Sequence, residues 1–113
     1  MPLIDSRVTV PVAEPVKEEL RSELGKLISI LHKSEAYLMI SLEDSCELWL
    51  GGKKLDRGAY VAVSLYGDAP AEAYDRLTAG ICRLYTEKLG IPGDAIYVTY
   101  HPVRDWGWNG HNF

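Results

Sequence analysis

The sequence has no long apolar run, no excess of basic charge and only two cysteines. No apolar stretch approaches the roughly 20 residues that a membrane-spanning helix needs, and Leu3 to Arg7 do not resemble a secretory signal. A net charge of -4 argues against a nucleic-acid-binding surface. These absences predict a cytoplasmic protein that binds neither nucleic acid nor membrane, although they leave open export by a route without a signal peptide.

Cysteine and histidine are scarce and scattered. Cys46 and Cys82 lie far apart and form no Cys-x-x-Cys pair, which predicts two reduced structural thiols. His32, His101 and His111 show no metal-ligand spacing. We therefore expect no metal site.

The sequence does contain clear apolar periodicity. Its 113 residues fit one domain, residues 1–113, and its hydrophobic fraction of 47% is ordinary for a globular protein. Amphipathic helices are predicted from Pro15 to about His32 and between Pro70 and Gly90, where apolar residues recur at three- and four-residue spacing. Strands are predicted over residues 3–10, 36–42, 46–50, 59–66 and 95–100.

The order strand, helix, strand occurs twice along the chain. Each crossover predicts a parallel pair of strands, and each helix has one apolar stripe with which to cover a sheet. The prediction is an α+β fold in which two pseudo-symmetric β-α-β units give a four-stranded mixed sheet with two helices on one face. Because the predicted strands are almost continuously apolar, we expect other subunits to bury the second face.

Pro2 follows Met1 and directly precedes a predicted strand. Removal of Met1 would leave Pro2 as a secondary amine at the end of a rigid element. Burial or a nearby cation would lower the pKa of that amine toward neutrality and make it a base for a carbon acid. Alternatively, Met1 is retained, and Pro2 is an amide that only blocks the first ladder position of the strand.

The last nine residues, 105–113, are rich in aromatic residues and glycine. Trp106, Trp108 and Phe113 all fall in this segment. Large exposed aromatic side chains usually mark a contact surface. The tail is therefore expected either to pack on its own or a neighbouring subunit, or to line an aromatic pocket.

Four features taken together resemble the macrophage migration inhibitory factor (MIF) family of the tautomerase superfamily. They are Pro2, Lys33 after the first helix, Gly51-Gly52, and the Trp-Gly-Trp-Asn-Gly segment that begins at Trp106. The resemblance covers essentially the whole chain. It implies a homotrimer of β-α-β-β-α-β subunits with a barrel-like interior and active sites between subunits. It also implies cofactor-independent keto-enol tautomerisation of small aromatic α-keto acids such as phenylpyruvate.

The resemblance also implies roles for particular residues. Pro2 becomes the acid/base after removal of Met1, and Lys33 lowers the pKa of Pro2 and binds the substrate carboxylate. Tyr97 matches the family's pocket tyrosine from the neighbouring subunit. Tyr37 matches a second aromatic residue at the mouth, and Phe113 matches a hydrophobic wall.

The chain departs from the family pattern at several positions. Thr99 stands where the family typically has asparagine two residues after the pocket tyrosine; its hydroxyl is still a donor, but the side chain is shorter and reaches less far toward the substrate. Tyr66, or Leu65 if the alignment shifts by one, is expected to face the substrate carboxylate through its backbone. Trp106 replaces a smaller apolar residue of the animal members, which predicts a narrower or more strongly stacking mouth beside Trp108. The Cys-x-x-Cys of some animal members is absent, so we expect no thiol-disulfide activity.

Three functions remain open at this stage. The first is a phenylpyruvate tautomerase-like isomerase. The second is a cytokine-like or protein-interaction trimer, with a receptor as partner and vestigial catalysis. The third is a ferredoxin-like ligand-sensing domain without chemistry, which the matched chain start and tail disfavour.

Overall fold

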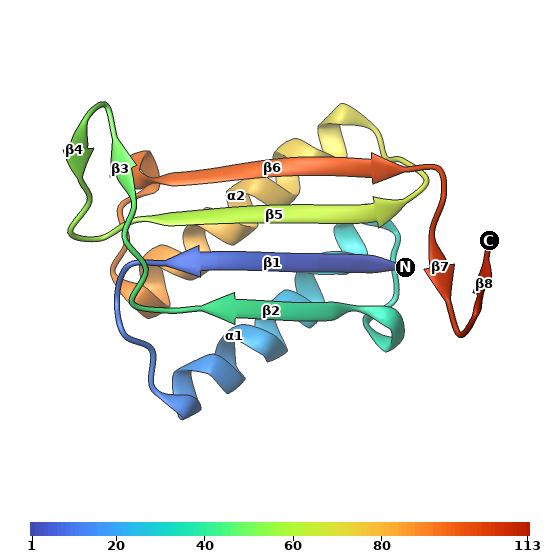
Figure 1. The fold of residues 1–113 in the computed structure, drawn as a ribbon, viewed down its shortest axis with the longest axis horizontal. Coiled ribbons are helices and arrows are strands. Elements are labelled where there is room, and N and C mark those ends of the chain that lie inside the picture. The colour runs from blue at the N-terminus through green and yellow to red at the C-terminus, as the bar shows by residue number, and fades with distance from the viewer.

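Four strands form one mixed sheet, and two helices lie side by side over one of its faces (Figure 1). The computed structural model describes residues 1–113. The strand order is β2-β1-β5-β6. The bounds are β1 Pro2–Val8, α1 Glu14–Leu27, β2 Met39–Glu43, β5 Ala59–Tyr66, α2 Ala71–Leu89 and β6 Ile96–Val103. No helix combines the length and the apolar character needed to cross a membrane.

The pairing of the strands follows the two halves of the chain. Strand β1 is parallel to β2, and β5 is parallel to β6, whereas β1 and β5 are antiparallel in the centre. The predicted fold, with two β-α-β units, a four-stranded mixed sheet and both helices on one face, is confirmed. It places the start of β1 beside the end of β5, because Pro2 pairs with Leu65.

Short 3-10 segments account for most differences at the predicted boundaries. Helix α1 ends at Leu27 and continues as η1 (Ile28–Leu31). The strand predicted from Ala36 begins only at Met39, because the Ser34 side chain accepts the N–H of Ala36 at 3.1 Å and stabilises the 3-10 turn η2 (Glu35–Tyr37). The corresponding turn in the second half is η3 (Gly93–Ala95).

Two short hairpins at opposite ends of the sheet were not predicted (Figure 1). Strands β3 (Trp49–Leu50) and β4 (Lys53–Lys54) replace the predicted strand over 46–50 and part of the loop that follows it. Strands β7 (Gly107–Trp108) and β8 (His111–Asn112) order the C-terminal segment. Both hairpins turn on two residues with positive φ, 60° and 80° at Gly51 and Gly52 and 53° and 86° at Asn109 and Gly110, as type I′ turns require.

The core lies between the sheet and the helices. Along β5, buried residues alternate strictly with partly exposed ones, because successive side chains point to opposite faces. Ser6 is the one buried polar side chain, and its hydroxyl oxygen lies 2.6 Å from that of Tyr85 on α2. The fully buried apolar core residues are Ile4, Val8, Leu24, Ile28, Val61, Val63, Leu65, Leu77, Ile81 and Ile91.

The other face of the sheet is open in the single chain. Strand β2 alternates exposed and partly exposed residues, and its exposed set includes both Met39 and Glu43. Asp5, Arg7 and His101 add further polar side chains on the strands of this sheet. The prediction of continuously apolar strands was therefore too strong, because the open face is mixed. Burial of this face by other subunits stays a prediction.

Candidate active site

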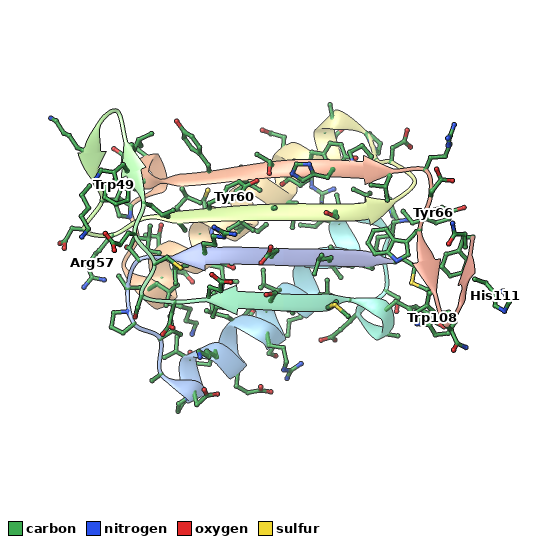
Figure 2. All side chains as sticks on the ribbon, viewed as in Figure 1. Trp49, Arg57, Tyr60, Tyr66, Trp108 and His111 are labelled. Carbon is green, nitrogen blue, oxygen red and sulfur yellow. The ribbon has the colours of Figure 1, made fainter.

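One end of the sheet gathers most of the residues singled out from the sequence. The start of β1, the end of β5 and the hairpin β7–β8 meet there, and Figure 2 shows Tyr66 and Trp108 at this end, with Trp49 at the opposite one. A cavity of about 750 Å³ opens here, within the usual size range of ligand sites. Its lining includes Pro2, Tyr37, Trp106 and Trp108. The further lining residues are Met1, Leu3, Ala36, Leu38, Met39, Asp105 and Gly107.

Pro2 is held rigidly at the inner side of this cavity. It is fully buried as the first residue of β1, and its backbone pairs with Leu65. The preceding Met1 carbonyl accepts the backbone N–H of Tyr66 at 3.0 Å. Two contacts with the end of β5 thus fix the chain start: the pairing of Pro2 with Leu65 and the hydrogen bond between Met1 and Tyr66.

Lys33 reaches the same place from the first crossover. His32, which ends η1 with a left-handed φ of 59°, turns the chain just before it. The Lys33 Nζ then donates to the carbonyl oxygen of Tyr66 at 2.8 Å. The pKa of the Met1 amino group is lowered from its ordinary value, first by burial and second by the positive charge of Lys33. A cation therefore lies close enough to the chain start to disfavour protonation of an amine there.

Aromatic rings continue from the cavity across the C-terminal hairpin. Trp108 meets Tyr37 edge-on at 5.8 Å between ring centroids, and it stacks with Phe113 at 6.4 Å. Phe113 also packs on Tyr66 at 5.4 Å, and its N–H donates to the carbonyl of Trp106 at 3.0 Å. Tyr37, Trp108 and Phe113 are each about half exposed, so these rings are available to an apolar or aromatic ligand.

Two of the predicted residues lie elsewhere in the single chain. Leu65 on β5 pairs with Pro2 on one side and with Pro102 of β6 on the other. Tyr97 lies five positions before Pro102 on β6, so it is about 16 Å from the level of Pro2 along the strands. Tyr97 instead lines a small apolar pocket beside the hairpin β3–β4.

Thr99 belongs to a hydrogen-bonded chain on β5 and β6. Its hydroxyl lies 3.0 Å from the Tyr60 hydroxyl and 2.8 Å from His101 Nε2. It does not line the Pro2 cavity. A single chain therefore brings together seven of the nine predicted residues and leaves Tyr97 and Thr99 apart.

Sequence reasoning overlooked some residues at the cavity. Asp105 lines it and forms an ion pair with Arg104 at 3.4 Å. The sequence could have indicated Asp105 as a cavity residue, because it directly precedes the predicted cavity residue Trp106. The Met1 carbonyl as an acceptor for Tyr66 had no sequence signal, because that contact depends on the pairing of β1 with β5. No group of three or more His, Cys, Asp or Glu side chains is placed to hold a metal ion.

Comparison with known proteins agrees with this architecture. The sequence model of the family "Macrophage migration inhibitory factor (MIF)" matches residues 1–113. A macrophage migration inhibitory factor homolog of Trichuris trichiura is 28% identical, with 100% of both chains covered.

Solved structures give the same result. The crystal structure of Leishmania major MIF2 superposes with a TM-score of 0.93 at 29% identity, covering 100% of this chain and 97% of the other. A macrophage migration inhibitory factor homologue from Prochlorococcus marinus superposes with a TM-score of 0.83 at 32% identity, covering 98% of each chain. The β-α-β-β-α-β fold of this chain is thus shared with these solved structures. The chain belongs to the macrophage migration inhibitory factor family.

Proposed function

We propose that this chain, after removal of Met1, is a cofactor-independent keto-enol tautomerase acting on small aromatic α-keto acids such as phenylpyruvate. The observation that carries the proposal is the meeting of Lys33, Tyr66 and the chain start at an aromatic cavity. Family membership supports the same reaction class.

The polar end of the cavity suits a carboxylate. With Met1 in place, the Met1 carbonyl oxygen accepts the N–H of Tyr66. Removal of Met1 takes this acceptor away and leaves the Tyr66 N–H free beside the Lys33 ammonium. A substrate carboxylate oxygen would take the place of the Met1 carbonyl oxygen and gain a charge-assisted hydrogen bond. The aryl group of the substrate would lie against Tyr37, Trp108 and Phe113.

The chemistry then requires one base. The Pro2 amine, kept partly neutral by burial and by Lys33, takes a proton from the carbon next to the ketone. The electron pair of that C–H bond forms the C=C bond, and the C=O π pair moves to the ketone oxygen. That oxygen takes a proton from water to give the enol, while protonated Pro2 returns its own proton to water. Lys33 and the Tyr66 N–H favour the negative charge that develops on the substrate. No cofactor is needed for this proton transfer.

The complete site is proposed to form in a homotrimer of one-domain subunits, each comprising residues 1–113. Tyr97 and Thr99 lie too far from Pro2 in their own chain, so a neighbouring subunit would supply them. Exposed apolar side chains support association, because Met39, Trp49 and Tyr97 are each more than half exposed. The expected assembly mass is three times the 12.6 kDa of the chain.

The test combines an intact mass with an assay of phenylpyruvate enol-keto conversion. We expect a mass without methionine and measurable turnover, and we expect Pro2→Gly to lose most activity while light scattering still reports a trimer. A protein that retains methionine, shows no turnover and still binds a protein partner would instead support the interaction role. Loss of the trimer in Pro2→Gly would call for Pro2→Ala as the matched replacement.

A further inference from the structure

A second cavity lies on the helix side of the sheet, away from the chain start. It has a volume of about 410 Å³ and lies between α1 and the edge strand β2. Its apolar walls are Leu20 and Leu24 from α1, with Leu38, Ile40 and Leu42 from β2 and the residue before it. Only Leu38 also lines the Pro2 cavity. The cavity exists because β2 is the last strand of the sheet and α1 covers it incompletely, so that Leu38, Ile40 and Leu42 stay partly exposed.

Two buried hydroxyl groups lie at the deepest part of this cavity. Ser6 and Tyr85 belong to its lining, are 1% and 0% exposed, and face each other with their oxygens 2.6 Å apart. Burial raises the pKa of Tyr85 to about 12, so both hydroxyls keep their protons at neutral pH. The pair therefore contains two O–H donors, but the bond between the oxygens uses only one. Neither hydroxyl has another partner, and a buried donor without an acceptor is unfavourable.

The mouth of the cavity carries balanced charge. Lys17 pairs with Glu14 and Arg21 pairs with Glu18, and all four residues belong to the lining. Because each cation already has a carboxylate partner, the mouth offers no uncompensated charge to attract an ion. The apolar walls further disfavour a charged occupant.

From these features we propose that the cavity between α1 and β2 binds an uncharged, mainly apolar small molecule with one hydrogen-bond acceptor at its inner end, such as an aryl ketone. The acceptor receives the unused O–H of the Ser6–Tyr85 pair, and the apolar body contacts the leucine and isoleucine walls. The volume is within the range of known small-molecule sites and far exceeds the space of one water molecule. This site is independent of the proposed chemistry at Pro2.

The experiment uses the assembled protein and two matched probes. One is 2-acetylnaphthalene, and the other is 2-ethylnaphthalene, which has a similar shape and no acceptor. Titration followed by amide and methyl NMR is expected to shift signals of Leu20, Leu24 and Ile40 with both probes. The ketone is expected to bind about fivefold more tightly, as one net hydrogen bond allows.

The variants make the hydroxyl assignment falsifiable. Ser6→Ala and Tyr85→Phe each remove one hydroxyl but leave one O–H without a partner, so each single variant keeps the preference for the ketone. The double variant Ser6→Ala/Tyr85→Phe has no donor and should bind both probes equally. It is expected to fold, since replacing both members of a buried hydrogen bond by apolar groups is tolerated.

Three outcomes overturn the proposal. One is a ketone preference that survives in the double variant. Another is signal shifts that fall only on Leu3, Tyr37 and Trp108, which would place the probes in the first cavity. The third is the absence of any shift at Leu20, Leu24 and Ile40, as expected if a second copy of the chain fills the space.

Discussion

Lys33 and Met1 bind the two backbone groups of a single residue, Tyr66. The Lys33 ammonium donates to the Tyr66 carbonyl at 2.8 Å, and the Met1 carbonyl accepts the Tyr66 N–H at 3.0 Å. The end of β5 therefore connects the first crossover to the chain start. Any change at Lys33 acts on both the charge and the geometry of that place.

Replacement of Lys33 by methionine keeps most of the side-chain stem and removes the charge. A nearby cation lowers the pKa of the amine at the chain start, so its removal raises that pKa. The base is the neutral amine, and the rising limb of kcat/KM against pH should therefore move to higher pH. At neutral pH, kcat/KM should fall by about 10- to 100-fold, since a charged hydrogen bond to the carboxylate is also lost.

Lys26 provides the matched control for this measurement. It lies on α1, is largely exposed and pairs with Glu23 at 3.2 Å. Lys26→Met should leave the pH profile in place. If Lys33→Met also leaves the rising limb unmoved, Lys33 does not set the pKa of the base.

Mixing two inactive variants tests whether sites are shared between subunits. Pro2→Gly removes the base, and Tyr97→Ala removes a residue about 16 Å from Pro2 along the strands of its own chain. In a mixed trimer, some sites combine an intact Pro2 with an intact Tyr97 from the neighbour. Unfolding and refolding the two variants together should restore a measurable fraction of phenylpyruvate turnover.

The control for mixing is each variant refolded alone under the same conditions. Turnover that stays at the level of the single variants, in a sample where mass spectrometry detects mixed trimers, would mean that Tyr97 does not complete a neighbour's site.

Trp108→Ala tests the aromatic wall of the cavity. The substitution removes the edge contact with Tyr37 and the stacking with Phe113. The KM for phenylpyruvate should rise by about 3- to 10-fold, with kcat changed less, because an aromatic contact contributes ground-state binding of this size. The KM for 2-oxobutanoate, which has no ring, should change little. His111→Ala in the same hairpin is the control variant, and an equal loss for both substrates would point to misfolding of the hairpin.

Gly90→Ala tests the end of α2. Gly90 has a φ of 68°, its N–H donates to the Thr86 carbonyl at 3.0 Å, and an added Cβ would lie 3.2 Å from a guanidinium nitrogen of Arg57. The left-handed conformation should cost alanine about 1–2 kcal/mol of unfolding free energy. Gly93→Ala, where φ is not positive and nothing crowds the new methyl, should change stability by less than about 0.5 kcal/mol. Urea unfolding measures both, and equal effects would contradict the backbone explanation.

The regular elements were predictable because their signals are local. Strand β5 matched its predicted bounds, since its nearly continuous apolar run lies between Gly58 and Gly67, and α2 ended where Gly90 predicted. Both hairpins were missed, although Gly51-Gly52 and Asn109-Gly110 are the dipeptides that type I′ turns favour. Each strand of these hairpins has only two residues, which is too short to show any alternation.

The site was less accessible to sequence reasoning than the fold. Lys33 and Tyr66 are 33 positions apart, and no spacing rule joins them; their proximity follows from the η1 turn and the register of β5. Most of the site residues were predicted from the resemblance to a family and not from the sequence pattern itself. Ser6 and Tyr85 are 79 positions apart, and no sequence signal joins them, because their contact depends on the packing of α2 over β1.

The two ends of the chain lie together at the cavity, with Phe113 packed on the ring of Tyr66 and Met1 bonded to its backbone. A purification tag or fluorescent fusion attached at either end would therefore lie at the mouth of the cavity that contains the candidate active site.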